Sequence, residues 1–336
     1  MPEPRSNRGK SREAGVKEIS EPTGMPVCTN AARWADMARR MHDRLSRLGV
    51  WFFTDALSAE ESRDLAAKVE QLGYSALWIP DTIGRDPFVN AAILLQATSD
   101  LVVATGIANI HVRHPGMMKQ GAMSLAELSA GRFILGLGVS HVPIVEGLRG
   151  LDYGKPLTTM STYLDAMESS PYRGVDPPDP PLTVLAALGP KMLALAAEKT
   201  AGAHPYWTTP DHTATAREVM GPEPLLCVEQ KCVLTTDREV AHDTARKQLS
   251  FYIDLPNYRN NWRRLGFTDD EIADRHPRFL DAVMAWGDEA AIARRIREHY
   301  DAGATHVCIQ PIDPAGDGKR PDWRLLELLS PNGESL

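Results

Sequence analysis

Cysteine is scarce in this sequence, and long apolar runs are missing. The 336 residues contain four cysteines, Cys28, Cys227, Cys232 and Cys308, whose number and spacing fit neither a disulfide framework nor a zinc site. Cys227 and Cys232 are five residues apart on a predicted strand and would point to opposite faces. No stretch reaches the roughly 20 apolar residues of a membrane span. We therefore expect a protein of the reducing cytoplasm that is not inserted in a membrane.

The sequence also lacks an excess of basic residues. It has 37 Lys and Arg against 44 Asp and Glu, for a net charge of −7. A nucleic-acid surface needs clustered positive charge, so small molecules are the expected partners. No H-E-x-x-H, H-x-H or C-x-x-C motif occurs, and we predict no metal site.

Residues 1–24 mix basic and acidic side chains and lack the apolar segment of a secretory signal. We predict a disordered tail there. The remaining residues, 25–336, are predicted to form one domain, because α/β barrels often exceed 250 residues as a single unit.

Short apolar runs alternate with amphipathic segments from Gly49 onward, which is typical of βα units around a parallel sheet. About eight such units predict a (β/α)₈ (TIM) barrel, an α/β fold, with insertions at the C-terminal face. The predicted strands are Gly49–Phe53, Ala76–Ile79, Leu101–Gly106, Phe133–Gly138, Leu182–Ala187, 203–207, Leu225–Leu234 and Thr305–Ile309. Predicted helices cover 88–98, 116–129, 157–168, 237–252 and 288–302, and another starts at Pro190.

Local signals place two further helices. Ser58 and Glu61 have the spacing of a capping box, and Gly73 ends the helix that they open. Upstream of the barrel, residues 31–48 predict an extra helix against its base or exterior, because apolar side chains recur at spacings of three and four. These are Trp34, Met37, Met41, Leu45 and Leu48.

In barrels of this kind the active site lies at the carboxyl ends of the strands, where the βα loops meet. We therefore look for functional residues there. The third predicted strand runs into Gly106-Ile107-Ala108-Asn109. A glycine at that point indicates either a turn or the close approach of a ligand to the backbone, and the two interpretations weigh equally.

The fourth predicted strand ends in Gly138-Val139-Ser140-His141. Gly136 and Gly138 share one face of the strand, where small residues let a planar ring lie against the backbone. His141 then falls in the barrel mouth, where an imidazole exchanges a proton near neutral pH or holds a substrate oxygen. A structural histidine is the competing interpretation.

The fifth predicted strand leads into Leu188-Gly189-Pro190-Lys191 at a helix amino terminus. Free N–H groups and the helix dipole favour an anion there, although a plain helix cap explains the same residues. Thr208, Thr209 and His212, after the sixth strand, supply further candidate donors.

Asp81 follows the second strand and faces the same mouth, where it either orients a substrate, takes part in proton transfer, or caps the next loop through Thr82. Residues 255–287 carry tryptophan, arginine and asparagine without a clean period, which suggests a lid or an oligomer contact.

These motifs, over about 49–312, resemble the luciferase-like monooxygenase superfamily, and in particular its actinobacterial coenzyme F420-dependent oxidoreductases. T-G-I-A-N-I-H-V-R-H-P (105–115) is similar to the family's third strand, whose non-prolyl cis peptide bulges behind the flavin ring. The match places that bond at Gly106–Ile107 or one bond later. S-A-G-R-F-I-L-G-L-G-V-S-H (129–141) resembles the fourth strand, and A-A-L-G-P-K (186–191) the phosphate-binding turn.

Further segments resemble an F420 subgroup of unknown substrate: L-P-N-Y-R-N-N-W-R-R-L-G-F (255–267), A-W-G-D (285–288) and A-G-A-T-H-V-C-I-Q (302–310). A sugar-phosphate dehydrogenase branch of the family has a glutamate where His141 stands and a histidine where Thr82 stands. The resemblance therefore does not extend to glucose 6-phosphate as substrate.

The resemblance implies hydride transfer between coenzyme F420 and a small organic substrate, with His141 and Asp81 as candidate catalytic residues. The predicted coenzyme-binding residues are Gly106, Ile107, Ala108, Asn109, Gly138, Val139, Ser140, Leu188, Gly189, Pro190, Lys191, Thr208, Thr209 and His212. A flavin or F420 reductase is the expected electron source. Luciferase-like relatives commonly dimerise, so the resemblance also implies a homodimer.

Three alternatives stay open at this stage. One is an FMN-dependent monooxygenase on the same scaffold. Another is a redox-silent barrel enzyme that binds a sugar phosphate, although Lys191 and Lys231 are poorly placed to form a Schiff base. The third is a barrel that binds the coenzyme without turnover.

Overall fold

The computed structural model describes residues 48–333 and, upstream of them, Trp34, Met37, Arg39, Met41, Arg44 and Leu45. The predicted tail, 1–24, lies outside the described residues. The six upstream residues are helical, as expected for most of 31–48. Leu48, however, begins the first strand instead of ending that helix, because its backbone pairs with Val307 of the last strand.

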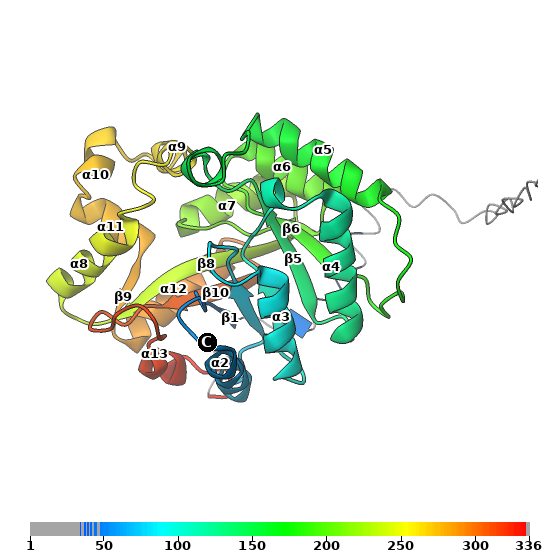
Figure 1. Ribbon diagram of the computed structural model, residues 1–336. Coiled ribbons are helices and arrows are strands. Elements are labelled where there is room, and N and C mark those ends of the chain that lie inside the picture. The colour runs from blue at the N-terminus through cyan, green and yellow to red at the C-terminus, as the bar shows by residue number, and fades with distance from the viewer. Residues whose placement is uncertain are drawn as a thin grey trace, which may run out of the picture.

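A closed parallel barrel forms the centre of the molecule (Figure 1). Its strands follow the order β10-β1-β2-β3-β5-β6-β7-β8, and β10 also pairs with β8, which closes the ring. The (β/α)₈ prediction is therefore confirmed. The barrel strands are β1 (Leu48–Trp51), β2 (Ala76–Ile79), β3 (Val102–Thr105), β5 (Phe133–Gly138), β6 (Leu182–Leu185), β7 (Gly202–Ala203), β8 (Leu225–Leu234) and β10 (His306–Pro311).

Two short strands extend the sheet: β4 (Ala108–Asn109) pairs with β5, and β9 (Ala285–Gly287) pairs with β8. The predicted sixth strand, 203–207, is wrong in extent, because β7 ends at Ala203. Pro205 follows, and Trp207 has a positive φ of 57°, which is incompatible with an extended strand.

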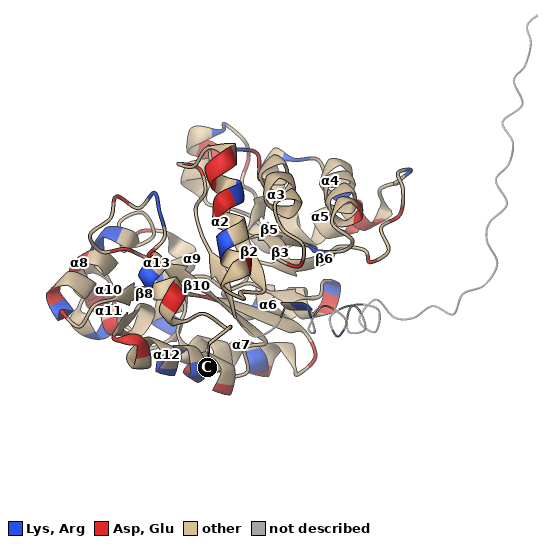
Figure 2. Ribbon diagram, turned by 90° about the horizontal axis from the view of Figure 1, so that it is seen from below, with Lys and Arg blue, Asp and Glu red and all other residues tan. Residues whose placement is uncertain are grey.

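Helices cover the outside of the barrel, and the capping box of Ser58 and Glu61 is present at the start of α2. Gly73, with φ of +84°, ends that helix. The outer helices are α2 (Ala59–Gln71), α3 (Pro87–Gln96), α4 (Pro115–Leu128), α5 (Pro156–Ser169), α6 (Pro190–Lys199), α7 (Pro210–Met220), α8 (Arg238–Leu249), α12 (Glu289–Asp301) and α13 (Trp323–Leu328). Figure 2, coloured by residue type, shows acidic and basic residues interspersed along these helices, for example on α2.

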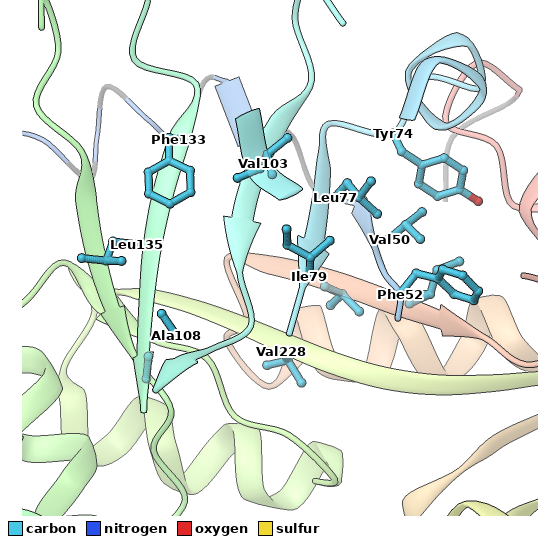
Figure 3. Close-up of a cluster of buried hydrophobic side chains, with 14 of the residues drawn as sticks. Val50, Phe52, Tyr74, Leu77, Ile79, Val103, Ala108, Phe133, Leu135 and Val228 are labelled. Atoms are coloured by element: carbon cyan, nitrogen blue, oxygen red, sulfur yellow. The ribbon is translucent and has the colours of Figure 1, made fainter. Parts of the chain in front are cut away.

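Successive strand residues point alternately outward and into the barrel. Val50 and Leu77 belong to the layer between strands and helices, which Figure 3 shows together with Ile79, Val103 and Phe133. Trp51, next to Val50 on β1, and Trp78, next to Leu77 on β2, point the other way and fill the barrel interior. Met41 and Leu45 also pack there. Cys227 lies in the interior and Cys232 in the outer layer, so the two point to opposite faces as predicted.

Residues 255–287 form three helices on one side of the barrel (Figure 1): α9 (Pro256–Arg264), α10 (Asp269–Ala273) and α11 (Pro277–Val283). They enclose a third apolar cluster, which includes Trp207, Trp262 and Phe279. Trp262 fastens α9 to the barrel, because its Nε1 donates to the carbonyl of Trp207 at 3.1 Å. None of the helices in the described part of the chain combines the length and the apolar composition of a membrane span.

Candidate active site

A cavity of about 660 Å³ opens at the carboxyl ends of the barrel strands. Its size suits a small-molecule site. The lining comes from the ends of most strands and from α9. Ten of the sequence-predicted residues line it: Asp81, Gly106, Ile107, Asn109, Gly138, Val139, Ser140, His141, Leu188 and Gly189.

One wall of the cavity is the turn after β3. The Gly106–Ile107 peptide bond is cis, at the first of the two positions that the resemblance indicated. Gly138 of β5 lies against this turn, and a Cβ at position 138 would come within 2.4 Å of the Ile107 Cδ1 atom. Glycine at position 138 therefore leaves room for the Ile107 side chain in this wall, and the absence of side chains at Gly106 and Gly138 allows a planar ring to approach it.

Asp81 holds the same turn in place. Its backbone N–H donates to the Ile107 carbonyl at 3.1 Å, and its Oδ2 accepts from the Asn109 N–H at 3.0 Å. Burial raises the pKa of this carboxyl, and the Asn109 N–H partly offsets the effect. The Thr82 hydroxyl donates to Asp55 Oδ1 and accepts from the Gly84 N–H. Asp55, and not Asp81, therefore holds the next loop through Thr82. Asp81 thus stabilises the wall of the cavity.

His141 stands beside this wall and faces two aromatic rings. The centroids of Tyr258 and Phe251 lie 5.6 and 6.0 Å from its own. Its imidazole makes no hydrogen bond to any described residue, and burial lowers its pKa to about 4. The side chain is therefore neutral at pH 7, able to accept a proton or to donate a hydrogen bond.

The far end of the cavity is the amino terminus of α6. Gly189 caps this helix without a side-chain hydrogen bond. Pro190 has no N–H, and the Met192 N–H donates to the Gly189 carbonyl at 3.0 Å, so the Lys191 N–H is the first-turn donor available to an anion, together with the helix dipole. Arg264 of α9 lies opposite, with Nη2 3.5 Å from the position that a Cβ on Gly189 would take. The guanidinium donates to Asn261 Oδ1 at 3.3 Å and forms no ion pair with a described carboxylate. A helix terminus and a cation thus converge on one point.

Aromatic side chains form a second wall of the cavity, which meets the turn after β3 where Trp51 lies against Gly106. Trp51 and Phe53 come from the end of β1, and Tyr206 follows β7. Tyr252 lies between α8 and α9, and Tyr258 belongs to α9. Their rings contact one another edge to face or tilted, with centroids 4.7 to 6.4 Å apart. We call these five residues the aromatic wall.

A buried ion pair lies behind the aromatic wall. Lys231 Nζ is 3.1 Å from Glu229 Oε1, and both side chains are 1% exposed. The same Nζ lies 3.6 Å from the ring centroid of Tyr206 and 3.9 Å from that of Trp207. Burial lowers the pKa of Lys231 to about 8, against the opposing effect of Glu229. The pair sits under the wall, and neither residue lines the cavity.

Six of the predicted coenzyme residues lie outside the cavity lining. Ala108 is buried in the layer between strands and helices, and Pro190 and Lys191 are on the exposed side of α6. Thr209 caps α7 by accepting from the His212 N–H, and His212 Nε2 donates to the Leu188 carbonyl at 2.9 Å. The remaining one, Thr208, is buried.

The structure adds residues that the sequence analysis did not select. The aromatic wall is one group, and the α9 residues Asn257, Asn260 and Arg264 are another. The second group carried a signal, because spacings of three and four put its polar side chains on one helix face. No group of three or more His, Cys, Asp or Glu able to hold a metal ion occurs in the described part of the chain.

Comparison with known proteins decides the family. The model of the luciferase-like monooxygenases matches residues 45–306. The chain belongs to this family. As a luciferase-like protein it is an oxidoreductase, and the resemblance noted in the sequence is confirmed.

Its luciferase-like relatives include proteins of two coenzyme types. Rv3520c of Mycobacterium tuberculosis, named among the coenzyme F420-dependent oxidoreductases, is 26% identical over 78% of this chain and 93% of its own length. The F420-dependent tetrahydromethanopterin reductase of Methanopyrus kandleri matches with a TM-score of 0.68 at 18% identity, over 84% of this chain and 97% of its own. An FMN-bound Baeyer-Villiger monooxygenase of Pseudomonas putida matches with a TM-score of 0.61 at 16% identity, covering 84% and 96%.

Proposed function

We propose that this protein is a coenzyme F420-dependent oxidoreductase that transfers a hydride between the deazaflavin and a small organic substrate. The observation that carries the proposal is one cavity that contains both a wall with two glycines at the turn after β3 and the amino terminus of α6 with Arg264 beside it. Gly106, Ile107 and Gly138 suit a planar ring, and Gly189 with Arg264 suits a phosphate. The name of the relative that matches along 93% of its length favours F420 over FMN.

The chain's own residues would bind and orient the partners of the reaction. When bound, the coenzyme supplies a carbon that donates or accepts a hydride. Asp81 fixes the turn after β3, and the aromatic wall excludes water from the space that faces it. His141, neutral at pH 7, would accept the proton that a substrate hydroxyl loses, or hold a substrate oxygen.

Coenzyme titration tests the proposal. We expect the purified protein to bind F420 with a dissociation constant in the micromolar range or tighter, measured by quenching of the coenzyme fluorescence. Binding of FMN in that range, with F420 binding at least a hundredfold weaker, would instead indicate an FMN-dependent monooxygenase. Failure of both coenzymes to bind would contradict the redox assignment.

The source of electrons and the oligomeric state belong to the same proposal. We expect a separate F420 or flavin reductase to supply the reduced coenzyme and the chain to form a homodimer. Sedimentation of the purified protein measures the second expectation directly.

A further inference from the structure

The space between the turn after β3 and the aromatic wall has few polar groups. Five rings line one side of it, and Ile144 and Met192 add apolar surface. Large apolar side chains continue to the mouth, where Ile83 is 73% exposed, Leu148 56% and Phe251 46%. Exposed apolar surface that continues into a cavity is typical of a site for an apolar ligand.

Positive charge is kept away from this space. Lys231 is the cation nearest the aromatic wall, yet it lies behind Tyr206 and Trp207 and is paired with Glu229. Arg149 donates to the Thr82 carbonyl at the rim. Arg264 lies beside Gly189, at the end assigned to the coenzyme phosphate. No described cation therefore lines the aromatic wall, where a phosphorylated or carboxylated substrate would need one.

The Tyr258 hydroxyl is an uncommitted hydrogen-bond donor of the aromatic wall. Trp51 Nε1 and His204 Nε2, which also line the cavity, are without a partner as well, and Trp51 Nε1 lies against Gly106 in the turn after β3. The Tyr206 hydroxyl donates to Gln310 Oε1 at 3.2 Å and lies 3.4 Å from the Tyr252 hydroxyl, while the Tyr153 hydroxyl donates to the Ser140 carbonyl. Tyr258 lines the cavity and is 6% exposed, and its hydroxyl makes no hydrogen bond to any described residue. This unpartnered hydroxyl at the cavity surface is available to donate a hydrogen bond to a ligand.

The setting of Tyr258 makes it a rigid donor. Its ring is stacked on Trp262 at 5.8 Å and meets the edge of Tyr252 at 5.3 Å, while His141 lies 5.6 Å away on the cavity side. Burial raises the pKa of Tyr258 well above its ordinary value. The hydroxyl thus stays protonated and can donate to a ligand oxygen.

We infer that the substrate is an uncharged, ring-bearing carbonyl compound whose oxygen accepts a hydrogen bond from Tyr258 while its ring packs on the aromatic wall. This inference rests on the proposed function, which assigns the turn after β3 to the coenzyme. It makes Tyr258 a specificity-determining residue contributed by α9, outside the barrel strands.

Matched ligands test the inference by binding alone. Acetophenone has a ring and a carbonyl, α-methylstyrene replaces the carbonyl by a methylene group of similar shape, and benzoate is charged. We expect the wild-type protein to bind acetophenone more tightly than the other two, measured by quenching of protein fluorescence with and without F420. In Tyr258→Phe, acetophenone should bind about fivefold more weakly, the effect of one neutral hydrogen bond, while α-methylstyrene binds as before.

The control variant is Tyr163→Phe, which removes a buried hydroxyl that donates to the Arg113 carbonyl outside the cavity. It should leave the affinities for all three ligands unchanged. Equal weakening of acetophenone and α-methylstyrene in Tyr258→Phe would assign Tyr258 to packing and overturn the inference. Tighter binding of benzoate than of acetophenone by the wild type would also overturn it. Coenzyme titration of the same samples reports separately on the proposed function.

Discussion

His141 is a neutral side chain that lines the cavity, and we propose that it exchanges a proton with the substrate. Desolvation lowers its pKa to about 4, so the imidazole loses its charge above that pH instead of above 6.5. We expect His141→Ala to slow turnover by about 10²-fold if His141 accepts or donates the proton. An unchanged kcat in the variant would remove it from that role.

The pH profile of the wild type adds a second readout. A reaction that needs neutral His141 should keep a constant kcat/KM between pH 7 and 5 and lose activity as the pH falls through about 4. Steady-state rates in buffers of constant ionic strength provide the measurement. A decline that begins near pH 6.5 would show an ordinary histidine and contradict the burial argument.

At the scale of elements, α9 brings an arginine to the amino terminus of α6. Arg264 is exposed in part, so we expect Arg264→Ala to weaken F420 binding by about tenfold, the lower end for a charged hydrogen bond. Arg264→Lys should bind F420 more tightly than Arg264→Ala but more weakly than the wild type. The matched control is a deazaflavin without phosphate, whose affinity should be the same for both proteins. An equal loss for both ligands would place Arg264 at another part of the coenzyme.

Strand β8 carries the buried pair of Glu229 and Lys231. Removing one partner should change the free energy of unfolding more than removing both. Lys231→Met removes the cation and leaves Glu229 as an unpaired group that is 1% exposed. We expect a loss of about 3–5 kcal/mol in the free energy of unfolding, because a buried charge without a partner is costly. Urea denaturation monitored by tryptophan fluorescence measures it.

The double variant Glu229→Gln with Lys231→Met is the matched control for that experiment. With no charge left to desolvate, it should recover most of the stability that the single variant loses. Double and single variants of equal stability would show that the loss comes from packing of the lysine chain against Tyr206 and Trp207.

At the scale of the whole molecule, several histidines are buried in their neutral form. Burial lowers the pKa of His204 and His212 to about 4 and that of His299 to about 3. In the unfolded chain each would have a pKa near 6.5, so below that pH the unfolded state binds more protons than the folded state. Stability that is complete above pH 6.5 is therefore lost as the pH falls toward 4.

We expect the urea midpoint to decline steadily between pH 6.5 and 4.5. Some carboxyls, such as Asp269 and Glu271, have pKa values below the ordinary ones in the folded protein. They take up protons mainly at lower pH, so they contribute little to the change in stability between pH 6.5 and 4.5. Equal midpoints at pH 7.5 and 5 would contradict the prediction.

The alternation of apolar and amphipathic segments in the sequence was sufficient to predict the barrel fold. The boundaries of β2, β5 and β8 agree with the predicted strands. For β2 and β5 the reason is that a strand buried on both faces is a continuous apolar run between turn signals, whereas β8 also carries Glu229, Gln230 and Lys231 at its centre. The sixth strand was overextended, because Pro205 and the positive φ of Trp207 turn the chain inward. Tyr206 therefore joins the aromatic wall instead of extending a strand.

Sequence alone determined the fold, the strand-end position of His141 and the glycines beside it, because parallel strands carry their carboxyl ends to one face whatever the loops do. Tertiary structure alone decided which side chains complete the cavity. Arg264 and Tyr258 reach it from a helix far along the chain, and Thr208 and His212 turn out of it. Helical spacing in the sequence puts Asn257, Asn260 and Arg264 on one face of a helix, but which face turns to the cavity depends on how α9 packs on Trp207 and its neighbours, and contacts between distant segments leave no local sequence pattern.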